Sequence, residues 1–319
     1  MEQGDSVRGR KSPERIVPLD PARESVSLVG SPVSTRSVSG RAAGFHVLPP
    51  LRLLPVYAFL VLFSLFMLVP VIYALAGSLT PERQLFTVPI VWIPTDPQWF
   101  NYVAPFQHSY ARYFLNSAVV SGIQTVAPLL LCSMAGYSLA KFNYPGRTAI
   151  FLFILSTIML PLQVTLIPTF LIVKQLGWLN SYAGLIVPGL ATTFGTFLMR
   201  QFFLDVPSEY LDAARIDGAS EPRIYWTVML PMIRPALAAL AIFSFTASWN
   251  SFLWPLVIVN DDLMRTIPLG IVFYFGSSRV PEYGQLLAVS LLATVPVLLV
   301  FLTMQRDITK GAALSGLKG

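Results

Sequence analysis

Residues 53–79 read LLPVYAFLVLFSLFMLVPVIYALAGSL, an apolar run without Asp, Glu, Lys or Arg. A bilayer core of about 30 Å requires roughly 20 apolar residues in one helix, because every backbone amide must be bonded within the segment. The run meets that length, and a charged residue at its centre would cost about 2.5 to 3.5 kcal/mol. We therefore expect residues 53–79 to cross a membrane.

Further stretches of the same kind predict an all-α integral membrane protein with six transmembrane helices. The other five are residues 115–140, 149–173, 181–199, 236–259 and 285–303. Residues 266–278, TIPLGIVFYFGSS, are apolar but too short to cross, so we expect them to be interfacial or re-entrant. Prolines such as Pro161 and Pro188 recur within the spans and permit kinks. The composition agrees, with 54% hydrophobic and only 12% charged residues.

Lys and Arg residues orient the predicted helices. With the N-terminus in the cytoplasm, most of the 22 basic residues fall on the cytoplasmic side. The opposite side keeps only Arg83, Arg112, Lys174, Arg265 and Arg279. The positive-inside rule therefore predicts that both termini are cytoplasmic. This orientation explains the net charge of +6 better than a nucleic-acid surface does, since the basic residues form no continuous face.

Composition divides the chain into three parts. Residues 1–50 are rich in Ser, Pro, Val and Arg without helical periodicity, and they are predicted to be a disordered cytoplasmic tail. We expect this tail to stay attached, because no apolar run of a signal peptide lies in the first thirty or so residues. Residues 51–305 form the predicted transmembrane domain, with a structured loop at about 205–235, and residues 306–319 form a cytoplasmic C-terminal tail.

Several function classes lack their sequence signals. Cys132 is the single cysteine, and His46 and His108 stand far apart, which argues against disulfides and metal or catalytic centres. No G-x-x-x-x-G-K-[ST] loop is present, since residues 311–318, GAALSGLK, carry Leu317 where Lys is required. We therefore expect no cofactor in this chain. An ion-coupled carrier and a membrane-embedded enzyme remain as alternatives, although the spans hold no titratable relay.

The most informative segment is residues 206–235, VPSEYLDAARIDGASEPRIYWTVMLPMIRP, which we call the elbow. Its first half predicts a short helix that ends at about Asp217. Pro207 favours the first turn, and Ser208 is a capping residue. Glu209 and Asp212 place negative charge near the positive end of the helix.

A second short helix is predicted after a sharp turn. Gly218 tolerates a left-handed backbone, and Ser220 with Glu221 and Pro222 forms a new cap and first turn. The small residues Ala213 and Ala214 make the first helix narrow enough to enter a groove on a partner protein. A solvated amphipathic helix on the membrane surface is the alternative.

The run at residues 212–219, DAARIDGA, followed by Pro231 and Pro235, resembles the EAA loop of ABC-importer permeases. Other segments agree with the carbohydrate-uptake branch and are similar to the smaller permease subunit of maltose-type transporters. They are residues 92–94, 101–102, 114–117, 136–140, 197–203, 249–255 and 316–319. The resemblance covers roughly residues 53–319.

The resemblance implies that the elbow docks its first helix into a cleft of a cytoplasmic ATP-binding subunit. The implied ATPase-coupling residues are Glu209, Asp212, Ala213, Ala214, Asp217, Gly218, Ala219 and Pro231. Asp212 stands where the family usually has Glu, which keeps the charge and shortens its reach. The implied partners are a second permease, normally a different chain, two copies of the ATPase that binds ATP and Mg, and an extracytoplasmic solute-binding protein. The implied location is a bacterial or archaeal-type plasma membrane.

Uncharged polar residues within the spans predict where a sugar or related small hydrophilic solute passes. Hydroxyl and amide groups beside aromatic rings recognise sugars, and interhelical bonding is the alternative role of each such residue. In the maltose-type relative the partner permease holds most of the sugar. The wider set is Asn116, Gln124, Ser156, Thr192, Thr193, Thr196 and Ser248, and the predicted substrate path is Gln163, Thr165, Thr246, Trp249 and Asn250.

Overall fold

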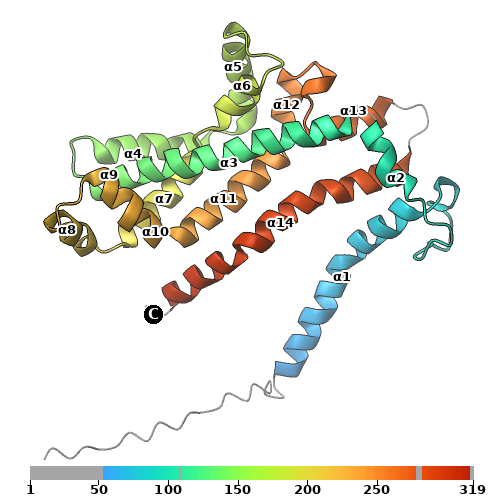
Figure 1. Ribbon diagram of the computed structural model, residues 1–319, viewed down its shortest axis with the longest axis horizontal. Coiled ribbons are helices and arrows are strands. Elements are labelled where there is room, and N and C mark those ends of the chain that lie inside the picture. The colour runs from blue at the N-terminus through green and yellow to red at the C-terminus, as the bar shows by residue number, and fades with distance from the viewer. Residues whose placement is uncertain (1–52, 108, 278–281, 317–319) are drawn as a thin grey trace, which may run out of the picture. The chain divides into compact units, whose positions relative to one another are not determined.

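The computed structural model describes residues 53–107, 109–277 and 282–316 (Figure 1). Within these residues every regular element is helical, which confirms the all-α prediction. The described residues from Val56 onward form one compact unit. The predicted N-terminal tail and His108 lie outside the described residues.

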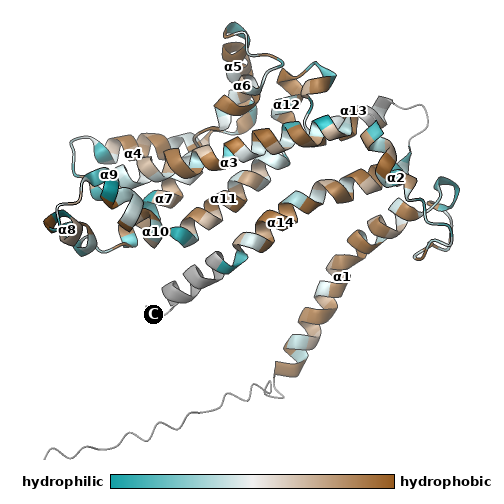
Figure 2. Cartoon of the chain, in the orientation of Figure 1, coloured by the Kyte–Doolittle hydropathy of each residue, from teal (hydrophilic) through white to brown (hydrophobic). Residues whose placement is uncertain are grey.

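Three helices of the described chain are individually long and apolar enough to cross a membrane. They are α1 (Leu54–Leu79), α3 (Tyr110–Lys141) and α14 (Tyr283–Gly316). In α14 the candidate span is the part Tyr283–Arg306. Apolar residues cover most of their length (Figure 2). α14 continues to Gly316, so the segment assigned to the C-terminal tail prolongs the last helix.

Three bent helix pairs bring the total to as many as six spans. In the first, α4 (Arg147–Ser156) and η4 (Thr157–Met159) meet α5 (Leu162–Gln175) at 103°. In the second, α6 (Tyr182–Ile186) and η5 (Val187–Gly189) meet α7 (Thr193–Asp205) at 40°. In the third, the helical stretch Glu221–Met232 meets α11 (Arg234–Trp249) at 80°.

The predicted spans 149–173, 181–199 and 236–259 are therefore not continuous helices. Leu160 and Pro161 are extended between η4 and α5, because proline disfavours a helical residue before it and lacks an N–H. Thr192 is extended before α7, and its hydroxyl caps that helix by accepting the N–H of Gly195 at 3.0 Å. α11 ends at Trp249 and is followed by the separate short helix α12 (Leu253–Ile258).

Short elements connect the spans. α13 (Ile267–Ser277) is an apolar helix of 11 residues, which agrees with the prediction that this segment is too short to cross. The 3-10 turn η7 (Asp262–Met264) precedes it. The segment after α1 contains η2 (Glu82–Gln84), α2 (Phe100–Val103) and η3 (Ala104–Gln107).

α3 lies at the centre of the bundle. It packs most extensively against α7 and then against α11, and α11 packs against α14 (Figure 1). α3 and α7 approach each other closely at Gly136, where an added Cβ would lie 2.6 Å from the Cβ of Met199. Helices in membranes associate through such close packing, because lipid provides no hydrophobic driving force between them.

Candidate functional site

The elbow folds as two short helices joined by a left-handed turn, as predicted. α8 (Glu209–Ile216) is followed by its C-cap residue Asp217, and Gly218 adopts φ 78°. α9 (Glu221–Ile224) continues through the π-helical segment η6 (Tyr225–Met229) into α10 (Leu230–Met232). The predicted capping bonds are absent, because the side chains of Ser208 and Ser220 cap neither helix. Ser208 is already helical, with φ −70° and ψ −20°, whereas capping residues usually have extended backbones.

The structure divides the predicted coupling residues between two faces of α8 and its turn. Leu211 is 2% exposed, and Ala214 and Ala219 pack against the same apolar cluster that contains it. Pro231, in α10, is partly buried. The remaining residues, Glu209, Asp212, Ala213, Asp217 and Gly218, are exposed.

An apolar side chain stands on the exposed face. Ile216, the last residue of α8, is 86% exposed although its neighbours in sequence are charged. α8 therefore combines a buried side that fixes it to the protein with a charged exposed side that includes one large apolar residue.

A pair of ionic contacts fixes the two elbow helices to each other. A guanidinium nitrogen of Arg215 lies 2.7 Å from a carboxylate oxygen of Glu221, and another lies 3.4 Å from Asp212. The hydrogen bond to Glu221 is the main cause that raises the pKa of Arg215 above its usual value. The Arg215 cation thus bridges α8 and α9.

Three side chains on one face of α3 attach the elbow to the bundle. Ser133 and Tyr225 share a hydrogen bond of 2.6 Å between their hydroxyls, and Tyr137 donates to Glu221 at 3.2 Å. Lys141 donates to the backbone carbonyl of Val206 at 2.5 Å. Residues four apart lie on the same face of a helix, so the last turns of α3 present a continuous contact surface to the elbow.

A cavity of about 340 Å³ lies elsewhere in the bundle, among α3, α5, α6, α11 and α12. Its volume falls within the range of roughly 300 to 1,000 Å³ that is typical of small-molecule sites. Among the described residues that line it, none is Asp, Glu, Lys, Arg or His. Its polar lining consists of hydroxyl and amide groups, from Gln124, Thr165, Thr169, Thr192, Ser244, Ser248, Ser251 and Thr266.

Gln124 joins three elements around this cavity. Its amide nitrogen donates to the carbonyls of Leu185 and Ile186 at 2.9 and 3.1 Å. Its amide oxygen accepts the hydroxyl of Ser248 at 2.7 Å. Gln124 therefore holds α3, α6 and α11 together and has its own bonding capacity largely satisfied.

The predicted substrate path is not gathered in one place. Thr165 lines the cavity, whereas Gln163 is exposed outside it, and Thr246 lines neither this cavity nor the one at Trp249. Trp249 and Asn250 line a second cavity of about 340 Å³, together with residues of α13 and α14. Trp249 is 4% exposed and donates its indole N–H to the carbonyl of Ala293 at 2.9 Å, so it also fixes α11 to α14.

Sequence reasoning missed four polar residues of the cavity, Thr169, Ser244, Ser251 and Thr266. Ser and Thr are common in membrane helices, and their positions on the helices do not reveal which of them face one another across breaks in the chain. Gln124, Thr192 and Ser248 belonged to the wider set of polar residues within the spans. The breaks themselves were signalled by Pro161 and Pro188.

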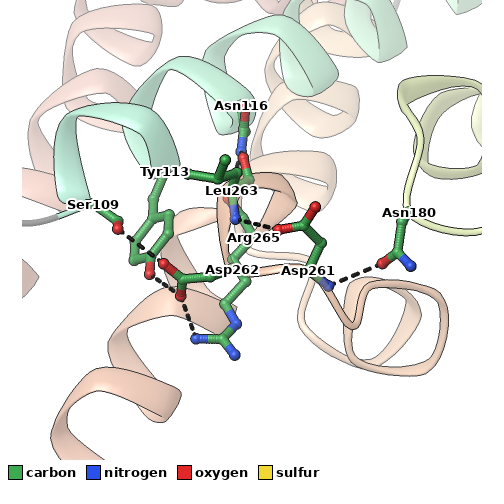
Figure 3. A network of polar contacts seen from close by, with 8 residues as sticks. All are labelled: Ser109, Tyr113, Asn116, Asn180, Asp261, Asp262, Leu263 and Arg265. Carbon is green, nitrogen blue, oxygen red and sulfur yellow. Dashed lines mark hydrogen bonds and ion pairs between the residues drawn. The ribbon is translucent and has the colours of Figure 1, made fainter.

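A polar network holds the segment between α12 and α13 against α3 (Figure 3). Asp262 accepts hydrogen bonds from Ser109 at 2.9 Å and from Tyr113 at 2.6 Å, and it pairs with Arg265 at 2.6 Å. The bond from Tyr113 is the main cause that lowers the pKa of Asp262, while burial opposes this shift. Asp262 is therefore held as a carboxylate.

Backbone contacts complete the network. Asn116 donates to the carbonyls of Leu263 and Arg265, both at 2.8 Å. On the other side, the side-chain oxygen of Asn180 accepts the backbone N–H groups of Asn260 and Asp261 at 2.5 and 3.0 Å. α3 consequently contacts this network at its start, the cavity at its middle and the elbow at its end.

Comparison with known proteins gives a consistent result. The family model described as "Binding-protein-dependent transport system inner membrane component" matches residues 132–310. The arabinooligosaccharides transport system permease protein AraQ of Bacillus subtilis is 35% identical, with 82% of this chain and 94% of that protein covered. The sn-glycerol-3-phosphate transport system permease protein UgpE of Yersinia enterocolitica is 34% identical, with 80% and 94% covered.

Solved structures support the fold. A chain of a bacterial ABC transporter involved in the import of the acidic polysaccharide alginate matches with a TM-score of 0.71 at 24% identity, covering 79% of this chain and 95% of that chain. At this identity the likeness concerns the fold alone.

Proposed function

The chain belongs to the family of binding-protein-dependent transport system inner membrane components, the permeases of ATP-binding-cassette importers, and on that premise we propose that it forms half of an import pathway. The solute is a sugar or a related small hydrophilic molecule. A separate ATPase subunit, which binds ATP and Mg, supplies the energy. The chain spans the plasma membrane six times, counting each bent pair as one span, with both termini in the cytoplasm.

The elbow carries this proposal. Its exposed face, with Asp212, Ala213 and Ile216, is available to a partner, while Leu211 on the opposite face is buried. A short helix with one side free and one side fixed is suited to dock into a groove. The distribution of basic residues favours a cytoplasmic position for the elbow, which makes a cytoplasmic ATPase the partner that fits.

The contacts of α3 provide a route for the work of ATP hydrolysis. α3 has 32 residues and is about 48 Å long at 1.5 Å per residue. Movement of the elbow acts on α3 through Ser133, Tyr137 and Lys141, which all bond to it. The same helix borders the cavity at Gln124, so displacement of the elbow changes the surroundings of the solute pathway.

The other components follow from the family. A second permease completes the pathway, two ATPase copies engage the two elbows, and an extracytoplasmic binding protein delivers the solute. The relatives are named for arabinooligosaccharide and sn-glycerol-3-phosphate transport, solutes that share hydroxyl groups and differ in charge, which supports a small hydroxylated solute without fixing its charge. Of the predicted path residues, Thr165 lines the cavity among α3, α5, α6, α11 and α12. Trp249 and Asn250 line the second cavity.

Purification of the tagged chain from its native membranes tests the proposal. We expect an ATPase to co-purify with it. The variant Ala213→Arg places a bulky charge on the exposed face of α8 and should release the ATPase while the chain stays in the membrane. Thr87→Arg adds the same charge on an exposed loop outside the elbow and should retain the partner. Reproducible absence of an ATPase from the wild-type preparation would contradict the proposal.

A further inference from the structure

We infer that the cavity among α3, α5, α6, α11 and α12 is a binding site on this chain for an uncharged, polyhydroxylated solute such as a neutral sugar. The inference rests on the proposed function and adds where this chain contacts the solute and which charge class it accepts. Interruptions of the helices, an unpartnered buried hydroxyl and the lining chemistry lead to it independently.

Breaks in three helical stretches meet at this cavity. Leu162 begins α5 directly after the break at Pro161, and it lines the cavity. Gly189 and Thr192 line it at the interruption between α6 and α7, and Ser251 lines it between α11 and α12. Irregular backbone at membrane depth is tolerated where it is buried in protein or borders a polar cavity, and discontinuous helices mark solute sites in transporters.

Thr266 provides a hydrogen-bonding group without a partner. Its side chain lines the cavity, and the residue is 5% exposed. Its hydroxyl is buried and has no hydrogen-bond partner in the described structure. A buried polar group left unpaired costs about 1 to 3 kcal/mol, so a bound solute that supplies a partner would gain affinity at this position.

Two further hydroxyls are available. Ser244 and Ser251 also line the cavity, and their side chains make no hydrogen bond within the described part of the chain. Trp254 adds an aromatic ring to the lining, with its indole N–H already bonded to the carbonyl of Gly184 at 3.0 Å. Free hydroxyl groups beside an aromatic ring suit the alternating polar and apolar surfaces of a sugar.

The absence of charge from the described lining selects the solute class. A phosphate or carboxylate bound there would have no cationic side chain to pair with, and an unpaired ion in such surroundings is strongly disfavoured. Hydroxyl and amide groups satisfy neutral hydroxyls without this penalty. The lining that this chain supplies therefore suits a neutral sugar better than its charged derivative.

The test uses the complete importer in proteoliposomes and a panel of matched solute pairs. Each pair consists of a neutral sugar and its anionic derivative: glucose and glucose 6-phosphate, galactose and galacturonate, and the oligomers of each. Thr266→Val removes the unpartnered hydroxyl with little change in shape, and Ser251→Ala removes a second hydroxyl. Thr80→Val is the control, because Thr80 is equally buried but lines neither cavity and bonds to the carbonyl of Ala76.

We expect ATP-dependent uptake of a neutral member of the panel by the wild-type importer. Thr266→Val and Ser251→Ala should each lower kcat/KM for it by roughly 3- to 10-fold, the effect of losing one neutral hydrogen bond, while Thr80→Val stays at the wild-type value. Gel filtration of each complex checks that the variants assemble.

Two results would overturn the inference while leaving the proposed function intact: ATP-dependent uptake of anionic members alone, or wild-type kinetics in both cavity variants. Absence of ATP-dependent uptake across the whole panel, together with absence of a co-purifying ATPase, would overturn the proposed function itself.

Discussion

Arg215 and Glu221 form an ion pair of 2.7 Å across the left-handed turn at Gly218, and Glu221 also accepts a hydrogen bond from Tyr137 of α3. The side chains of the pair are 42% and 40% exposed, so their attraction is screened by solvent and adds little to stability. The pair joins α8 to α9 and so bears on the angle between them. Because Glu221 also bonds to α3, that angle is linked to the position of the central helix.

Reversal of this ion pair tests whether it orients the elbow. We expect Arg215→Glu to change the stability of the chain by less than about 1 kcal/mol but to lower the amount of solute imported per ATP hydrolysed. The double variant Arg215→Glu/Glu221→Arg restores the attraction and should recover much of that ratio. Equal defects in the single and double variants would show that Arg215 acts on another protein instead of on Glu221.

Substitution of Gly218 tests the turn itself. We expect Gly218→Val to abolish solute uptake while membrane insertion remains intact, because a left-handed backbone costs a branched side chain roughly 1 to 2 kcal/mol or more. An added Cβ at this residue would meet nothing within 4 Å, so the effect comes from backbone strain alone. Gly218→Asn is the matched control, since Asn tolerates this backbone and should retain uptake. Full uptake by Gly218→Val would contradict the coupling role.

The elbow was predictable from sequence because its signals are local. Gly218 between two short amphipathic segments determines where α8 stops, and no distant residue is needed to recognise it. Its attachment was not predictable, since the bonds to Ser133, Tyr137 and Lys141 join residues far apart in the chain. The helical spacing of those three residues identifies a common face, but not what that face contacts.

The helix breaks show a second limit of sequence reasoning. Hydrophobic length alone predicted a continuous span at 149–173, yet a bend of 103° occurs at Pro161. Proline permits both a kinked span and a complete break, and packing around the cavity decides between them. For the same reason the polar residues of the spans could be identified, but their grouping around one cavity could not.

Acidification tests the network at Asp262. Its folded-state pKa is lowered, chiefly by the hydrogen bond from Tyr113, so the ionised carboxylate contributes stability above its ordinary pKa of about 4. That contribution is lost as the pH falls below this value through the lowered pKa. We expect the Tm of the wild type to exceed that of Asp262→Asn at neutral pH, and the difference to close on acidification.

A neighbouring carboxylate provides the control for this experiment. Asp261→Asn keeps an oxygen that accepts the backbone N–H of Leu263, a bond of 3.0 Å in the structure, and should not reproduce the pattern of Asp262→Asn. In Tyr113→Phe the main cause of the pKa shift is removed, so the folded and unfolded pKa values of Asp262 lie closer together, and the acid-linked loss of stability should be smaller and end at a higher pH. An identical pH dependence of Tm in the wild type and Tyr113→Phe would contradict the assigned role of this bond.

Packing of α3 against α7 is tested by two glycines of the same helix. At Gly136 an added Cβ would lie 2.7 Å from the backbone nitrogen of Arg200, as well as against Met199. Backbone cannot rotate away as a side chain can, so α3 and α7 must separate. We expect Gly136→Ala to destabilise the protein by roughly 1 to 3 kcal/mol, the usual cost of overpacking.

At Gly122 nothing lies within 4 Å of the added atom, and Gly122→Ala should leave stability unchanged or raise it by up to about 1 kcal/mol. Thermal unfolding in detergent measures both variants against the wild type. Because α3 also holds the elbow, Gly136→Ala should reduce solute uptake as well. Equal stability of the two variants would contradict the close approach of α3 and α7.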